Sequence, residues 1–178
     1  RHSGKSEIFE LYTSNLSNDQ YKEQKLAVDP HIWLDPENAK IITNRIVKIL
    51  SEYDPGNSKK YKNNGEKINV RLNELDYQLS SEMIEISNRN YLVLHDAYQY
   101  FESRYQLKNA GSITLNLYHF LGVRRLKEIQ NMIKSNEVLC IFGEPQYSQK
   151  IIEVLIEGTT VKKGILDPIG TDLSPGPE

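Results

Sequence analysis

The stretch LVLHDAYQYF, residues 92–101, combines the two patterns on which the fold depends. A short apolar run predicts a buried strand, and it ends in His95 and Asp96. Aromatic residues then recur at helical spacing, which predicts a helix directly after the strand. A strand followed at once by a helix is the repeating unit of α/β proteins. It places His95 at the carboxyl end of a strand, where such folds bind their ligands.

The same alternation continues along the rest of the chain. Further buried strands are predicted in GSITLN, VLCIFGEP and VKKGILDP, which are residues 111–116, 138–145 and 161–168. Helical patterns follow the strands at residues 97–107, 122–135 and 147–157. Strands that alternate with helices at this spacing predict βαβ units and a mostly parallel sheet. The fold class is therefore α/β over residues 89–178.

The first half of the chain is predominantly helical. Asp35 followed by Pro36 predicts the start of an amphipathic helix of about four turns, which ends at the turn signal EYDPGN. Residues 57–86 carry a single apolar stripe and predict one helix roughly 45 Å long at 1.5 Å per residue. Such a helix suits a strut between two lobes. The alternative is two shorter helices broken near Gly65, because glycine lowers helix propensity.

Composition excludes several classes of function. The net charge of -2 gives no electrostatic argument for binding nucleic acid or an anionic membrane. No apolar run approaches the roughly 20 residues that span a bilayer. Residues 1–27 are polar and predict a lead-in loop. Cys140 is the single cysteine, and inside an apolar run it is most simply a small buried side chain.

Four side chains are candidates for a metal site. His95, Glu144 and Asp167 each end a predicted strand, and His31 lies upstream between two Asp-Pro pairs. Imidazole nitrogen and carboxylate oxygen suit zinc, and they would also accept manganese or iron. Each residue also has a structural explanation: Asp167 precedes a proline and could serve a turn. Likewise, Asp96 is most simply the cap of the helix that follows it.

Four motifs, taken together, resemble those of zinc-specific substrate-binding proteins of ABC transporters, of the ZnuA type. They are DPHIWLDPENA, LVLHDAYQYF, CIFGEPQ and ILDPIG, and the similarity runs from about residue 28 to residue 172. The resemblance implies two α/β lobes joined by one long rigid helix, with the metal between the lobes. Residues 28–55 would end the N-terminal lobe, residues 56–88 would form the helix, and residues 89–178 would form the C-terminal lobe.

The resemblance also assigns roles to residues. The metal ligands of the family fall on His31, His95 and Asp167. Glu144 is expected to support a ligand or to be structural. An imidazole at position 95 implies zinc, because manganese-type relatives place a carboxylate there. We expect a partial chain that lacks most of the N-terminal lobe and one further histidine ligand. Relatives often pair a cysteine at position 140 with a C-terminal one, and the segment LYHFLGV departs from the family pattern.

The function implied is that of a receptor and not of an enzyme. It would bind zinc tightly at the periplasmic or extracellular face of a bacterial cell membrane and deliver it to the permease of an ABC importer. We expect no nucleic-acid partner, and a monomer when the protein is complete. Two alternatives remain open: a zinc-dependent hydrolase, in which Glu144 would act as general base, and a manganese or iron receptor of the same fold.

Overall fold

The structure is a computed structural model, and it describes residues 29–114, 122–135, 137–171 and 173–176. The chain divides into two compact units, Arg1–Pro30 and His31–Glu178. Only Asp29 and Pro30 of the first unit are described, so the architecture below is that of the second. The predicted lead-in at 1–27 and most of the segment LYHFLGV lie outside the described residues.

The second unit begins with a short 3-10 turn, η2 (Ile32–Leu34), and the helix α2 (Pro36–Tyr53). The predicted start of α2 is confirmed: an Oδ1 oxygen of Asp35 accepts a hydrogen bond from the backbone N–H of Glu37 at 2.8 Å, and proline occupies the first helical position. A second 3-10 turn, η3 (Pro55–Asn57), follows where the turn signal predicted the end of α2.

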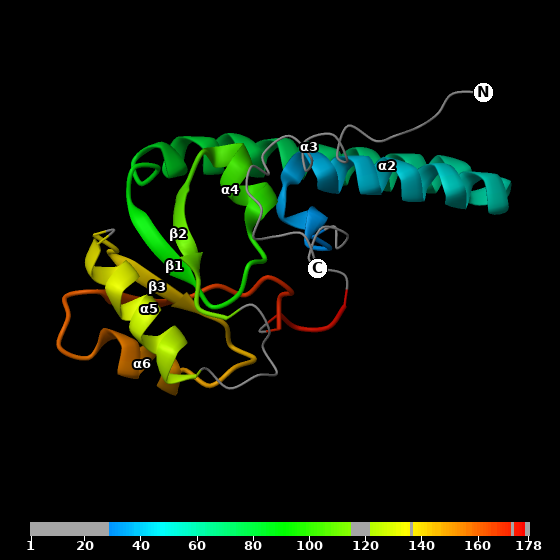
Figure 1. Cartoon of the computed structure of the whole chain (residues 1–178). Coiled ribbons are helices and arrows are strands. Elements are labelled where there is room, and N and C mark those ends of the chain that lie inside the picture. Colours follow the sequence, from blue (N-terminus) through cyan, green and yellow to red (C-terminus); the bar gives the residue numbers. More distant parts are fainter. Residues whose placement is uncertain (1–28, 115–121, 136, 172, 177–178) are drawn as a thin grey trace, which may run out of the picture. The chain divides into compact units, whose positions relative to one another are not determined.

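The next helix, α3 (Ser58–Ile84), is continuous over 27 residues, so the alternative of a break near Gly65 is wrong. Gly65 is buried because α2 packs directly against it. A methyl group added at this position would lie 2.5 Å from Cγ2 of Val47. Figure 1 shows the two helices side by side. The glycine therefore serves close helix packing instead of ending the helix.

The predicted parallel sheet is also confirmed. Its order is β2-β1-β3-β4, and every neighbouring pair is parallel. The connections contain three helices that cover residues near those predicted from the sequence. The strands are β1 (Asn90–Val93), β2 (Lys108–Ser112), β3 (Cys140–Gly143) and β4 (Lys162–Ile165), and the helices are α4 (Gln99–Tyr105), α5 (Val123–Ser135) and α6 (Lys150–Ile156).

The two faces of the sheet bury different clusters. Alternate residues of a strand point to opposite faces, so Leu92 and Leu94 pack with residues of the helices α5 and α6 in one cluster. Figure 1 shows these two helices beside the sheet. Val93 points the other way and packs with Ala97 and Tyr98, against Leu34 of η2. The segment that follows His31 is thereby packed against the strand that leads to His95.

Two local predictions need correction. The second strand is Lys108–Ser112, so it begins three residues before the apolar run that suggested it and overlaps that run at Gly111 and Ser112. Backbone hydrogen bonds to Val93 and Leu94 continue at Ile113 and Thr114, and residues 115 and 116 lie outside the described residues. The helix α4 begins at Gln99 with Tyr98 as its N-cap residue, so Asp96 does not cap it. The Asp96 carboxylate instead accepts a hydrogen bond from the side-chain amide of Gln99 at 2.9 Å.

None of the helices in the described ranges is both long enough and apolar enough to cross a membrane.

Candidate metal centre

The carboxyl ends of β1, β3 and β4 meet at one edge of the sheet because the strands are parallel. The register pairs Val93 with Phe142 and Gly143 with Ile165. Continuing it by one or two residues brings His95 opposite Glu144 and places Asp167 one strand further along. Three of the four candidates thus come to one edge, as the strand endings predicted.

His95 and Glu144 are in direct contact. Nδ1 of His95 lies 2.5 Å from Oε1 of Glu144. Glu144 is 2% exposed, whereas the His95 side chain is 18% exposed. A carboxylate buried in this way holds the imidazole by one nitrogen and leaves the other, Nε2, for a different partner.

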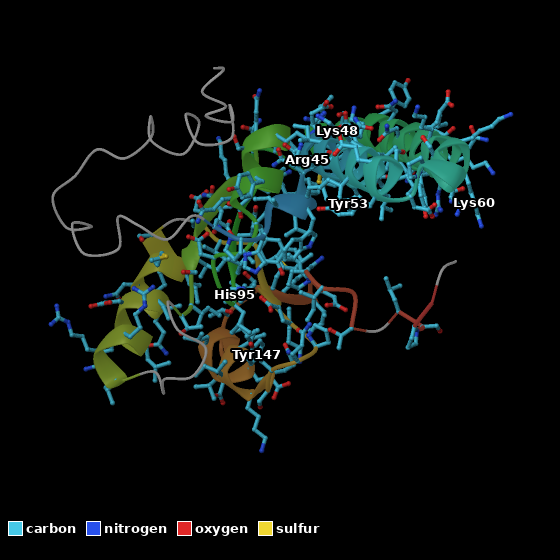
Figure 2. The ribbon with its side chains drawn as sticks, turned by 90° about the vertical axis from the view of Figure 1, so that its right-hand side faces the viewer. Arg45, Lys48, Tyr53, Lys60, His95 and Tyr147 are labelled. Carbon is cyan, nitrogen blue, oxygen red and sulfur yellow. The ribbon has the colours of Figure 1, made fainter. Side chains whose placement is uncertain are left out.

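His31 approaches His95 from a different element. It precedes η2, and its backbone carbonyl accepts a hydrogen bond from the N–H of Leu34 at 3.2 Å. The rings of His31 and His95 meet edge to face with their centroids 5.4 Å apart. Figure 2 marks His95 where the sheet approaches the blue segment after His31. Two imidazoles from distant parts of the sequence are therefore neighbours.

Asp167 lies in the turn after β4. Its Oδ1 oxygen accepts hydrogen bonds from Nε2 of Gln146 at 2.9 Å, from the hydroxyl of Thr171 at 3.0 Å and from the backbone N–H of Ile169 at 3.3 Å. The last of these is the side-chain-to-backbone pattern of an Asx turn. Both the turn and the position at the sheet edge that the sequence suggested are therefore present.

The described part of the chain holds no ready-made group of three or more His, Cys, Asp or Glu side chains that could hold a metal ion. The structure brings His31, His95 and Glu144 together as contacting pairs. Asp167 shares the same edge, with its Oδ1 oxygen bonded as described above. A metal bound by both histidines and Asp167 would need a change in this local arrangement.

The electrostatics of this edge favour a cation. Burial, and then the negative charges of Glu144 and Asp167, raise the pKa of the Tyr98 hydroxyl well above its ordinary value. The same carboxylates that disfavour a phenolate would stabilise a positive ion beside them.

Two residues that the sequence did not single out also contribute. The indole N–H of Trp33 donates to the backbone carbonyl of Pro168 at 2.9 Å, and Gln146 contacts both Asp167 and the hydroxyl of Thr171. Both residues fall inside motifs noted above, DPHIWLDP and CIFGEPQ. No pattern within either motif could reveal that the first would reach the turn at Pro168.

The chain thus combines a parallel α/β lobe, a long continuous helix, and imidazoles beside carboxylates at the sheet edge, an arrangement that favours a metal-binding protein. The sequence matches the family described as "Zinc-uptake complex component A periplasmic" over residues 2–178, and the chain belongs to this family.

The chain is 39% identical over 150 residues to the high-affinity zinc uptake system protein ZnuA of Brucella abortus. The matched region covers 84% of this chain and 45% of that relative. A solved structure described as ZnuA matches with a TM-score of 0.74 and 30% identity, covering 82% of this chain and 54% of that one. The Zn(II)-bound E280Q variant of AdcAII from Streptococcus pneumoniae matches with a TM-score of 0.73 and 27% identity. This match covers 89% of this chain and 57% of the AdcAII chain.

This chain spans about half the length of the curated relatives it matches. It also covers little more than half of each of the two solved structures. The relatives are named as zinc uptake proteins and not as enzymes.

Proposed function

We propose that this chain is the zinc-binding part of a high-affinity zinc receptor that serves an uptake system. The observation that carries the proposal is the meeting of His31 and His95, with ring centroids 5.4 Å apart, at the carboxyl edge of a parallel sheet. Membership of a zinc-uptake family supports zinc as the cargo. Two imidazole ligands also suit zinc better than the harder manganese ion.

We further propose His31, His95 and Asp167 as the zinc ligands. Glu144 would accept the hydrogen bond from Nδ1 of His95, so that Nε2 presents its lone pair to the metal. This carboxylate–histidine arrangement fixes the ring and raises the basicity of the ligand nitrogen. For Asp167 to bind, its carboxylate would exchange part of its hydrogen bonding for the metal.

The wider role is proposed on the same basis. The receptor would bind zinc outside the cytoplasm, in the periplasm or at the outer face of the cell membrane, and deliver it to the permease of an ABC importer. Residues 28–55 would belong to an N-terminal lobe, and α3 would be the helix that connects it to the C-terminal lobe. A long continuous helix in that position would limit how far the lobes can move apart.

Zinc titration in competition with a chelator tests the proposal. We expect wild-type protein to bind zinc stoichiometrically. His31→Ala, His95→Ala and Asp167→Asn should each lose more affinity than the roughly 10–100-fold typical of a supporting residue. Tyr77→Ala is a matched control, because it removes a ring that is 81% exposed on α3.

Manganese and iron run in parallel test the alternative receptor. Binding of either as tight as that of zinc would argue against zinc as the cargo. Unchanged zinc affinity in both histidine variants would refute the ligand assignment.

A further inference from the structure

The segment that carries His31 has little structure of its own to hold it. Over the described residues 29–35, which are called the His31 segment below, the only regular element is η2, a single 3-10 turn of three residues, none of which is fully buried. The position of His31 relative to His95 therefore depends on what this segment contacts.

Besides the ring contact of His31 with His95 and the helix α2, which follows directly at Pro36, three contacts connect the segment to the rest of the unit. Leu34 packs on the cluster of Val93, Ala97 and Tyr98. The indole of Trp33 donates to the carbonyl of Pro168. The third contact is ionic, because Oδ1 of Asp35 lies 3.3 Å from a terminal guanidinium nitrogen of Arg104.

Arg104 engages two acidic side chains at once. Its Nε and one terminal nitrogen donate to the two carboxylate oxygens of Asp76 on α3, at 2.7 and 2.5 Å. Its other terminal nitrogen faces Asp35, and the hydroxyl of Tyr105 donates to the same Asp76 at 2.9 Å. The three charged side chains are only 17–25% exposed, so solvent screens the pairs less than it would at an open surface.

The three elements joined in this way are those on which the candidate site depends. Asp35 lies four positions after His31 and also caps α2. Arg104 belongs to α4, the first helix after His95. Asp76 lies in α3, the long helix, which provides a rigid reference for both.

We propose that Arg104 is a positioning residue for the zinc site, which fixes the His31 segment against α3 and α4 and so sets the separation of the two imidazoles. It does not touch the metal. This inference rests on the proposed function only where it concerns zinc, because attachment of the His31 segment can be measured without metal.

Two variants separate positioning from general stability. Arg104→Gln removes all the ionic contacts. Asp35→Asn removes only the negative charge that faces Arg104, since the side-chain oxygen of asparagine caps a helix as well as that of aspartate does. Arg124→Gln is the matched control: it makes the same chemical change at a side chain that is 94% exposed and paired with Glu128 of its own helix.

The first readout is fluorescence of the metal-free protein. Trp33 is the only tryptophan in the chain and lies in the segment concerned. Arg104→Gln and Asp35→Asn should both make its emission easier to quench. The double variant, which carries both substitutions, should be quenched no more easily than Arg104→Gln alone. Arg124→Gln should match wild type. Unchanged quenching in both variants would overturn the proposal, whether or not the protein binds zinc.

The second readout is zinc affinity, again by chelator competition. We expect a loss of about 10–100-fold in both variants, the range typical of residues that orient metal ligands. Arg104→Lys keeps the charge but cannot reach both carboxylates with a fixed fork. Compared with Arg104→Gln, the Arg104→Lys variant should therefore recover more of the thermal stability than of the zinc affinity.

If wild type binds zinc and Arg104→Gln binds it equally well, the proposed function stands and the positioning role is wrong. If wild type binds no zinc while quenching changes as expected, Arg104 still positions the segment and the proposed function fails for this chain.

Discussion

For Gly65→Ala, helix propensity and packing predict changes of opposite sign in the free energy of unfolding. Propensity alone predicts that the substitution stabilises α3 by about 0.8–1.0 kcal/mol. In the structure, however, the new methyl would lie 2.5 Å from Cγ2 of Val47 and 3.8 Å from Cγ2 of Thr43. Ordinary carbon contacts are at about 3.5–4.0 Å, so the first approach is about 1 Å too close.

Val47 cannot easily move away. A β-branched side chain in a helix has one strongly preferred rotamer, so the two helices must separate instead. Overpacking of this kind costs about 1–3 kcal/mol. Subtracting the propensity gain leaves a net loss of about 0–2 kcal/mol in the free energy of unfolding. The melting temperature should fall by about 2–4 °C for each kcal/mol in a chain of this size.

Val47→Ala provides the decisive background, because it removes the group that the new methyl would strike. There the propensity gain should remain without the clash, so Gly65→Ala should become stabilising by up to about 1 kcal/mol. The coupling energy between the two positions should be about 1–3 kcal/mol. Urea unfolding of the four proteins, followed by circular dichroism, measures it. Gly56→Ala is a control, since its methyl would meet nothing closer than 3.7 Å.

A Gly65→Ala protein that is about 1 kcal/mol more stable than wild type in both backgrounds would refute this reasoning. It would mean that α2 and α3 are not in contact at this position.

Three further predictions follow from other contacts. Glu144→Gln should lower zinc affinity about 10–100-fold by weakening the hold on His95, while metal-free thermal stability changes little; equal affinity in a chelator titration would contradict this. A hydrogen bond from Arg104 holds the pKa of Asp76 below its ordinary value. The ion pair therefore stabilises the fold above about pH 4, and this stabilisation is lost as pH falls through the folded-state pKa of Asp76. The free energy of unfolding, measured across acidic pH, should fall less in Arg104→Gln than in wild type. Burial raises the pKa of the Cys140 thiol, so alkylation at neutral pH should be slower in folded protein than in urea, and equal rates would argue against it.

The sequence by itself determined the elements and their class. Alternating apolar runs and helical patterns predicted a parallel α/β lobe, and the pair Asp35-Pro36 predicted the start of α2, because periodicity and capping are local properties. The strand endings also predicted that His95, Glu144 and Asp167 share one edge. Parallel strands bring their carboxyl ends together whatever the details of the packing.

Only the tertiary structure decided which side chains meet. It showed that Gly65 is where α2 packs closely on α3, and that His95 contacts Glu144 with one nitrogen while His31 approaches its ring. It also showed Arg104 bridging from α4 to two other elements. Contacts of this kind join residues far apart in the sequence. Their distances depend on how loops and helices pack, and no local pattern in a single sequence encodes them.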